Sequence, residues 1–200
     1  MKIILDVDGV LADFTTSALI VVEEVTGKRF KSPDVTEWDF TKAIGLSPSE
    51  ASAVKKAIGA RRGFAASITP YPQARQGIRR LCELGDVFCV TSPWKTNSWW
   101  IEERNAWLAL HFGIERVHHA SDKTPYEADV FVDDKSSHVR DWLAAWPGRT
   151  AVFWRTPHNT SEAVPWGAHS TSSWDALYEI AREAARGPVQ PSLPMPEAVS

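Results

Sequence analysis

Cysteine is scarce in this sequence, which has only Cys82 and Cys89 among its 200 residues. We expect the first in a helix and the second in a strand, so the pair provides no disulfide framework, and a reducing, cytoplasmic location fits best. His118 and His119 do not complete a zinc pattern with these two isolated cysteines.

Long apolar runs and an excess of charge are also missing. The first apolar run stops at Asp6, too early for a signal peptide, and no stretch approaches the length of a membrane-spanning helix, so we expect no membrane partner. The formal net charge is −3, which provides no field for holding a polyanion. A nucleic-acid polymer is therefore not an expected partner, and both a monomer and a homodimer remain open.

Hydrophobic residues make up 44% of the chain, and tryptophan is abundant, with ten copies. This composition is sufficient for one well-buried domain with a small insertion. Five tryptophans recur at helical spacing and are expected to pack helices against a sheet: Trp100, Trp107, Trp142, Trp146 and Trp174.

Short runs of consecutive apolar residues alternate with helical patterns, which indicates a parallel sheet covered on both faces. We expect strands at residues 2–7, 87–91, 130–132 and 150–154, with 116–118 as a further candidate. We expect helices at 74–84, 98–112 and 139–146, the third capped by Ser136 or Ser137, and a last helix capped by Ser172 or Ser173. The fold class is thus α/β, with three layers in a Rossmann-like arrangement.

About eighty residues separate the first two strands, far more than one crossover helix needs. Helical patterns at 14–25 and 47–58, with an aromatic loop at 33–40 between them, predict a small helical cap at 15–68. The core domain then comprises residues 1–14 and 69–186. The proline-rich segment 187–200 is expected to be a disordered tail.

Asp6 and Asp8 follow the first strand within the segment Asp-Val-Asp-Gly-Val, where ligands bind in open α/β sheets. A turn at Gly9 allows both carboxylates to reach one site, and their repulsion favours a bound cation such as Mg²⁺. A role limited to capping or turn formation is the alternative.

Three further groups of polar residues lie at or near later expected strands. Asp133-Asp134 follows one apolar run, Thr91-Ser92 follows another and suits phosphate oxygens, and Lys123 lies ten residues before Asp133. Acid pairs, hydroxyls and a lysine together suit phosphoryl transfer. An ordinary turn at Thr91 and a solvated surface lysine at position 123 are the alternatives.

These motifs, in this order, resemble those of the haloacid-dehalogenase superfamily of phosphohydrolases. The segments Asp8 to Phe14, Thr91-Ser92-Pro93 and Asp122-Lys123-Thr124 resemble in particular the 5′(3′)-deoxyribonucleotidases, of a bacterial or phage type. The resemblance implies that Asp6 attacks phosphorus and that Asp8 serves as acid and base. Thr91 and Lys123 would hold and neutralise the phosphate.

The resemblance also implies a magnesium site. The Asp6 carboxylate, the Asp8 carbonyl and one acid of the pair would hold the ion; alignment of the motif favours Asp134, with Asp133 as the alternative.

Substrate choice is expected to depend on the cap and on the loops that leave the strands. Phe14 is the expected stacking partner of a base, and further candidates are Trp38, Phe40, Phe64 and Trp94, although aromatic residues more often belong to the core. Ser92 and Lys95 are candidates for phosphate contact, and His138 lies near the acid pair in sequence. The basic residues 55–56 and 61–62 are interpreted as a solvated face that can also steer an anion.

The expected function is Mg²⁺-dependent dephosphorylation of nucleoside monophosphates, deoxyribonucleotides among them, through an aspartyl phosphate. One alternative is a phosphatase for another small ester or for a nucleic-acid 3′-phosphate. A second is a noncatalytic nucleotide-binding protein on the same fold, which has no need for Asp6, Asp8, Lys123 and the acid pair together.

Overall fold

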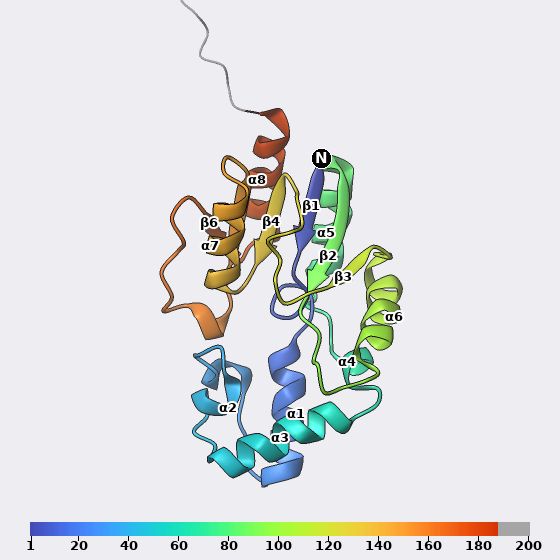
Figure 1. The fold of residues 1–200 in the computed structure, drawn as a ribbon, viewed down its shortest axis with the longest axis vertical. Coiled ribbons are helices and arrows are strands. Elements are labelled where there is room, and N and C mark those ends of the chain that lie inside the picture. Colours follow the sequence, from blue (N-terminus) through green and yellow to red (C-terminus); the bar gives the residue numbers. More distant parts are fainter. Residues whose placement is uncertain (188–200) are drawn as a thin grey trace, which may run out of the picture.

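The computed structural model describes residues 1–187, and its centre is a six-stranded sheet in the order β3-β2-β1-β4-β5-β6 (Figure 1). All neighbouring strands are parallel. The strands are β1 (Lys2–Leu5), β2 (Asp86–Thr91), β3 (Val117–His119), β4 (Val130–Asp133), β5 (Thr150–Trp154) and β6 (His169–Thr171). The strand order reverses between β1 and β4, and this is the point at which parallel sheets bind their ligands.

Helices cover both faces of the sheet, as a buried parallel sheet requires. The helices α5 (Ala74–Leu84), α6 (Trp100–Phe112) and α8 (Trp174–Arg186) lie on one face, and α7 (Ser136–Ala145) lies on the other. Side chains alternate along β1, so that Ile3 and Leu5 join the first core and Ile4 joins the second. The α/β fold with three layers is confirmed.

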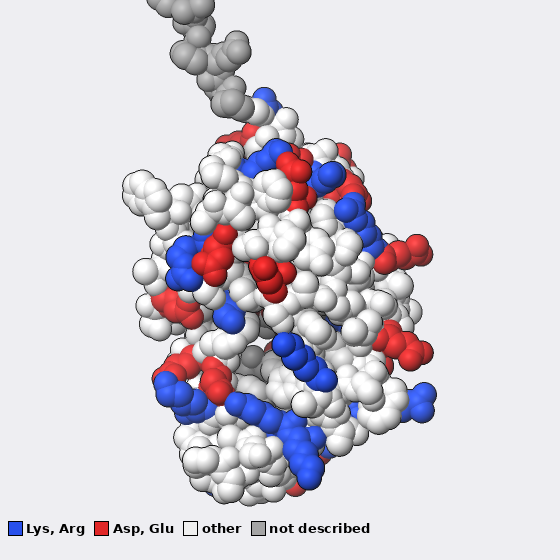
Figure 2. Space-filling model, in the orientation of Figure 1, with Lys and Arg blue, Asp and Glu red and all other residues white. Residues whose placement is uncertain are grey.

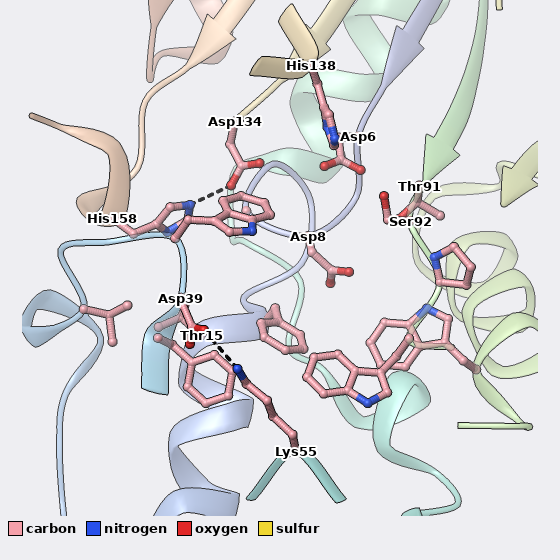
Figure 3. Close-up of a pocket in the computed structure, with 18 residues that line it drawn as sticks. Asp6, Asp8, Thr15, Asp39, Lys55, Thr91, Ser92, Asp134, His138 and His158 are labelled. Atoms are coloured by element: carbon pink, nitrogen blue, oxygen red, sulfur yellow. Dashed lines mark hydrogen bonds and ion pairs between the residues drawn. The ribbon is translucent and has the colours of Figure 1, made fainter. Parts of the chain in front are cut away.

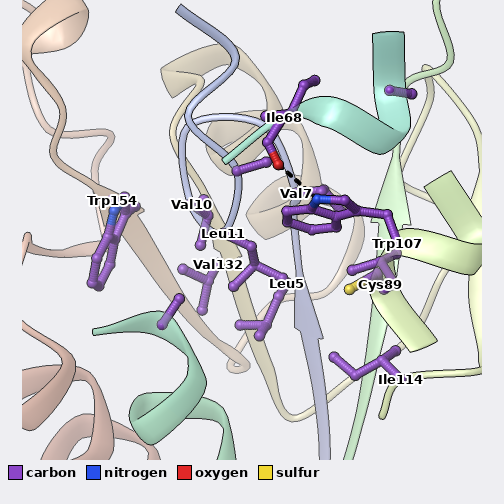
Figure 4. Close-up of a cluster of buried hydrophobic side chains, with 14 of the residues drawn as sticks. Leu5, Val7, Val10, Leu11, Ile68, Cys89, Trp107, Ile114, Val132 and Trp154 are labelled. Atoms are coloured by element: carbon purple, nitrogen blue, oxygen red, sulfur yellow. Dashed lines mark hydrogen bonds between the residues drawn. The ribbon is translucent and has the colours of Figure 1, made fainter. Parts of the chain in front are cut away.

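Figure 4 shows part of the larger core, including Leu5, Val132 and Trp107. The indole nitrogen of Trp107 donates a hydrogen bond to the carbonyl of Ile68 at 2.7 Å, so α6 anchors the segment that leads back from the β1–β2 insertion. Trp142 and Trp174 are buried against the sheet as expected, and Trp146 is partly buried after the end of α7.

The connection from β1 to β2 forms the lower part of the molecule in Figure 1. It contains α1 (Phe14–Thr26), η1 (Ser32–Asp34), α2 (Phe40–Ala43), α3 (Pro48–Ala60) and α4 (Phe64–Ser67). Helix α1 packs against α3 beyond the carboxyl ends of the strands, whereas α4 packs against α6. Ser47 and Glu50 form a reciprocal capping box that starts α3, with Pro48 at its first position.

Several element ends differ from the sequence-based expectations. Strand β1 stops at Leu5 instead of residue 7, because the carbonyl of Val7 accepts hydrogen bonds from Leu11 and Ala12 and turns the chain. Neither Ser136 nor Ser137 caps α7, since Ser136 is its first residue. Ser173 caps α8 through the amide of Ala176.

Strand β6 was not expected, because its three residues, His-Ser-Thr, are polar and pair only with β5 at the edge of the sheet. The short helix α2 begins at the end of the expected aromatic loop. The expectation of a disordered tail falls almost wholly outside the described residues, which end at Gly187.

Candidate active site

Asp6 follows β1 directly and lies at the point where the strand order reverses. Its amide donates to the carbonyl of Val132 at 2.9 Å, so the residue keeps its place in the sheet although the strand has ended. Its carboxylate is almost wholly buried, and its Oδ1 lies 2.8 Å from Nζ of Lys123. The expected lysine therefore neutralises the expected nucleophile, and it is not a solvated surface residue.

Asp133 ends β4 and is completely buried. Its Oδ2 lies 2.6 Å from Nζ of Lys123 and 3.1 Å from Nδ1 of His138, and its Oδ1 accepts the amide of Lys135 at 2.8 Å. Both oxygens are thus occupied by protein donors, so Asp133 mainly positions Lys123.

Asp134 is held differently from its neighbour. Its Oδ2 lies 2.8 Å from Nε2 of His158, and its backbone carbonyl accepts a hydrogen bond from the Asn159 amide at 2.7 Å. Its Oδ1 is buried and has no hydrogen-bond partner among residues 1–187. Gly9, at φ +83°, passes so close that a Cβ there would lie 1.9 Å from Asp134 Oδ2, so only glycine fits.

The carboxyl groups of this cluster differ in their tendency to ionise. Burial raises the pKa of Asp6 well above its ordinary value, the charges of Asp133 and Asp134 raise it further, and Lys123 opposes them only in part. Burial and the charge of Asp133 likewise raise the pKa of Asp134, against the opposing hydrogen bond from His158. Burial also acts on Asp133, but Lys123 and His138 outweigh it and lower its pKa.

These groups fit a divalent cation. One ligand atom from each of Asp6, Asp133 and Asp134 lies within 4.8 Å of the others. Three carboxyl groups face the single Lys123, and Oδ1 of Asp134 has no partner among residues 1–187, so the cluster can hold more negative charge than the lysine balances. An all-oxygen set of this kind suits Mg²⁺, and the bare oxygen makes Asp134 the better ligand of the acid pair.

Asp8 follows in the turn after β1 and points into the same cavity (Figure 3). Its Oδ1 accepts a hydrogen bond from Nη2 of Arg104 at 2.7 Å, and its side chain is 23% exposed. Burial raises the pKa of Asp8, against the opposing charge of Arg104. The two carboxyls of the first motif therefore have different cationic partners.

Thr91 and Ser92 reach the cavity from the end of β2. Thr91 is buried, and the Ser92 hydroxyl donates to the carbonyl of Ala120 at 3.4 Å. In Figure 3, Thr91 and Ser92 lie at the same end of the cavity as the carboxyl groups of Asp6 and Asp8. Lys95, expected to contact phosphate, is exposed and does not line the cavity.

The cavity has a volume of about 390 Å³ and joins these polar groups to an aromatic wall. The wall consists of Phe14, Trp38, Phe40, Trp94 and Trp100. The Phe14 ring stacks on Trp94 with centroids 5.8 Å apart and meets Phe40 edge-on at 6.0 Å. Trp100, expected to pack on the sheet, instead lines this cavity.

Phe64 is the expected aromatic residue that does not line the cavity. It is buried behind the wall, where it stacks on Trp100 and contacts Phe14 edge-on. Phe64 therefore supports the aromatic wall from behind and does not face the cavity.

Lys55 and Asp39 close the cavity from the side of the helical insertion and lie 2.9 Å apart. Lys55 belongs to the basic group expected on a solvated face, and Figure 2 shows Lys and Arg side chains gathered over this lower part of the molecule, beside the hollow.

Arg104 and His158 are among the site residues that escaped the sequence analysis. Both were detectable in principle. Arg104 lies on the apolar face of an expected helix, between Trp100 and Trp107, and a charge on a buried face indicates a partner. His158 follows β5, so the rule that strand ends form the site applies to it as well.

No helix within residues 1–187 is both long and apolar enough to cross a bilayer.

The sequence matches known nucleotidases over nearly its whole length. The model of the family described as "5' nucleotidase, deoxy (Pyrimidine), cytosolic type C protein" matches residues 1–185. The human cytosolic-type 5′(3′)-deoxyribonucleotidase is 27% identical over 204 residues, which cover 95% of this chain and 97% of the human protein. A Bordetella bronchiseptica protein, provisionally named for the same activity, is 30% identical over 173 residues, covering 81% and 87%.

Solved structures share the fold. A haloacid dehalogenase-like hydrolase from Burkholderia xenovorans has a TM-score of 0.59 and 19% identity, over 92% of this chain and 97% of that one. A hydrolase of the same type from Bacillus subtilis, solved with bound magnesium, has a TM-score of 0.55 and 13% identity, over 90% and 98%. The fold is therefore that of the haloacid-dehalogenase hydrolases. Because the family model covers residues 1–185, the chain belongs to the cytosolic type C family of deoxynucleotide 5′-nucleotidases, hydrolases that act on phosphoric monoesters.

Proposed function

We propose that this protein hydrolyses nucleoside monophosphates, deoxyribonucleotides among them, to nucleoside and phosphate, with Asp6 as the nucleophile. One observation carries the proposal: the buried Asp6 carboxylate, in an ion pair with Lys123, lies at the polar end of a cavity whose other wall is aromatic. The names of the family and of the human relative support a nucleotide as the substrate.

The nucleophilic step uses the groups at the ends of β1 and β2. An oxygen of Asp6 attacks phosphorus and forms an aspartyl phosphate, while Lys123 offsets the charge on the nucleophile and on the transferring group. Thr91 and Ser92 donate hydrogen bonds to the phosphate oxygens. The nearly complete burial of Asp6 excludes bulk water and strengthens these interactions.

Asp8 serves the two proton transfers. It protonates the nucleoside oxygen as the bond to phosphorus breaks, and it later removes a proton from the water that attacks the aspartyl phosphate. One carboxyl cannot be nucleophile and acid together, since the first role requires it ionised and the second protonated. The separate cationic partners of Asp6 and Asp8 suit this division.

Mg²⁺ would be held by the carboxylates of Asp6 and Asp134 and by the backbone carbonyl of Asp8. When bound, the ion supplies positive charge that stabilises the phosphoryl oxygens. His158 and Asn159 fix Asp134 for this role, as residues behind metal ligands usually do. The B. subtilis structure with magnesium supports the choice of ion.

The aromatic wall would hold the base. Phe14 and Trp94 present stacked rings to the cavity, and stacking tolerates several bases. Trp38, Phe40 and Trp100 complete an apolar surface that suits a planar ligand.

The proposal is tested by phosphate release from 5′- and 3′-nucleoside monophosphates, both ribo and deoxy, with Mg²⁺ or with EDTA. Asp6→Asn is the blank, because its amide retains the shape of the side chain but cannot attack phosphorus. We expect release that depends on the metal and disappears in the blank. If the protein hydrolyses p-nitrophenyl phosphate but no nucleotide, it is a phosphatase with another substrate. If it hydrolyses none of these esters, the result favours a noncatalytic nucleotide-binding protein.

A further inference from the structure

Arg104 is a completely buried cation that the proposed chemistry has not used. It belongs to α6, and its guanidinium carbon lies 4.9 and 5.2 Å from the ring centres of Trp100 and Trp107. Its Nη2 donates to Asp8 Oδ1 at 2.7 Å, whereas its Nε and Nη1 are buried with no partner in the part of the chain that the structure describes. Asp8 is thus its one charged partner there.

Stability does not account for this arrangement. Burying a guanidinium costs several kcal/mol, and replacing a buried ion pair by apolar side chains is often neutral or stabilising. The other residues on this face of α6, Trp100, Trp107 and Leu108, are large and apolar. An arginine with two unsatisfied donors among them indicates a role in the site.

The geometry identifies what Arg104 contributes. Asp8 lies in the turn after β1, where its backbone forms a β-bridge with Ala12; this bridge holds the main chain but makes no contact with the carboxyl group. Arg104 engages only Oδ1, and among residues 1–187 no other donor bonds to the Asp8 carboxyl. The two indole rings restrict the guanidinium, and Asp8 lines the cavity with its Oδ2 free of hydrogen bonds to residues 1–187.

We propose that Arg104 is a positioning residue that holds Asp8 with Oδ2 directed at the oxygen of the leaving group. The inference rests on the function proposed above. As Asp6 bonds to phosphorus and the bond to the nucleoside oxygen breaks, the proton on Oδ2 moves to that oxygen. Water then bonds to phosphorus and gives a proton to Oδ2, and the bond from phosphorus to Asp6 breaks to release phosphate.

The test uses leaving groups that differ in their need for a proton. A nucleoside alkoxide requires protonation, whereas p-nitrophenolate leaves without it. We compare kcat/KM for a nucleoside monophosphate and for p-nitrophenyl phosphate, because this constant covers the steps through departure of the leaving group. In Arg104→Met we expect a loss of about 100-fold for the nucleotide, the scale of general acid catalysis, and of less than about threefold for p-nitrophenyl phosphate.

Three further variants separate positioning from folding. Arg104→Lys retains a cation and should recover part of the nucleotide activity. Leu108→Ala, on the same buried face, should change both esters equally. If Arg104→Met is not folded by circular dichroism, Arg104→Gln takes its place in the comparison.

Equal losses for both esters in the Arg104 variants, or nucleotide activity within threefold of wild type, would overturn the inference. The proposed substrate fails separately, if wild type hydrolyses p-nitrophenyl phosphate but no nucleotide. Phenyl phosphate, whose leaving group requires a proton, then replaces the nucleotide in the same comparison.

Discussion

At the scale of single residues, the site has more negative charge than its own cations can balance. Asp6 and Asp133 share Lys123, while the Asp134 carboxylate bonds within residues 1–187 only to His158 and keeps one oxygen without a partner there. A bound cation would remove this repulsion in the folded state alone, so metal binding and stability should be coupled.

Magnesium should therefore raise the thermal unfolding midpoint of the wild-type protein relative to the same protein in EDTA. At a concentration 100 times the dissociation constant, the stabilisation is about 2.7 kcal/mol. Asp134→Asn should lose most of this increase, measured by differential scanning fluorimetry. Asp141→Asn, at an exposed position of α7 where the carboxylate pairs with Arg140, should keep it, and an equal increase in both variants would remove Asp134 from the metal site.

Phe14→Ala should raise KM for nucleotides more than KM for p-nitrophenyl phosphate, because Phe14 faces the cavity and the smaller ester lacks a base. Phe64→Ala is the matched control: its ring packs behind the wall, and it should lower the unfolding free energy by about 3–5 kcal/mol without such selectivity. Steady-state kinetics on both esters checks the difference. Equal changes for the two esters in Phe14→Ala would exclude it from base recognition.

The residues of the site differ in how visible they are in the sequence. Asp6 and Asp134 follow strands and Thr91 ends one, and the carboxyl ends of neighbouring parallel strands meet at one edge. The bond between Arg104 and Asp8 joins residues 96 positions apart and follows from how α6 packs on the turn after β1. Sequence periodicity gives the face on which Arg104 lies, but not what it contacts.

At the scale of the elements, periodicity predicted the buried strands and the long helices, whereas short elements depended on contacts that the sequence does not display. β6 is polar and forms because β5 offers it an edge. Helix α2 forms where Asp39 accepts the amides of Thr41 and Lys42 and also pairs with Lys55 of α3. That acid therefore joins two elements of the insertion at the mouth of the cavity.

Asp39 should make the insertion sensitive to acid. Hydrogen bonds from Thr41 and Lys55 outweigh partial burial and lower the pKa of Asp39 from 3.8 to about 2. Because this pKa is lower in the folded than in the unfolded state, ionised Asp39 stabilises the fold fully at pH values above the unfolded-state pKa of 3.8. This stabilisation is lost as the pH falls through about 2. In urea unfolding, wild type should exceed Asp39→Asn in stability at pH 5, and the gap should narrow from pH 4 to pH 2.

Asparagine keeps the helix cap at this position, so the comparison isolates the charge. A gap that stays constant from pH 5 to pH 2 would show that the Asp39 carboxylate does not contribute through its ionisation. Lys55→Met should reduce the same gap, since it removes the cation.

At the scale of the whole molecule, the loop after β2 joins the insertion to the sheet. Nδ2 of Asn97 donates to the carbonyls of Ile58 at 3.0 Å and Arg61 at 2.9 Å, at the end of α3. Glu103 of α6 accepts the amides of Gly63 and Ala65 just beyond. The segment that carries Ser92 and Trp94 is thereby tied to the C-terminal end of α3 in the insertion.

Asn97→Ala should loosen this connection. It removes a donor from two carbonyls, of which that of Ile58 keeps the amide of Arg61, so we expect a loss of about 1–3 kcal/mol in unfolding free energy. Amide hydrogen exchange should accelerate at the C-terminal end of α3 and change little in β1 and β4. Asn105→Ala on α6, which removes a hydrogen bond to His119 of β3, is the control, and acceleration in both variants alike would argue against a specific tie.

The overall architecture was predictable because strand and helix patterns alternate along the chain, and only right-handed parallel connections join them in one sheet. The strand order and the placement of α4 on α6 were not, since they depend on which faces pack together.

The anchoring of Asp134 by His158 and Asn159 has a consequence for synthesis of the protein. Asp6 and Asp8 leave the ribosome first, but the residues that hold Asp134 in place leave it only after β5. A chain released just before that point carries Asp6, Asp8 and Lys123, but its Asp134 lacks the hydrogen bonds with His158 and Asn159 that would hold it for a cation. Premature termination between the end of β5 and His158 would therefore produce a chain with strands β1 to β5 but without the residues that hold Asp134.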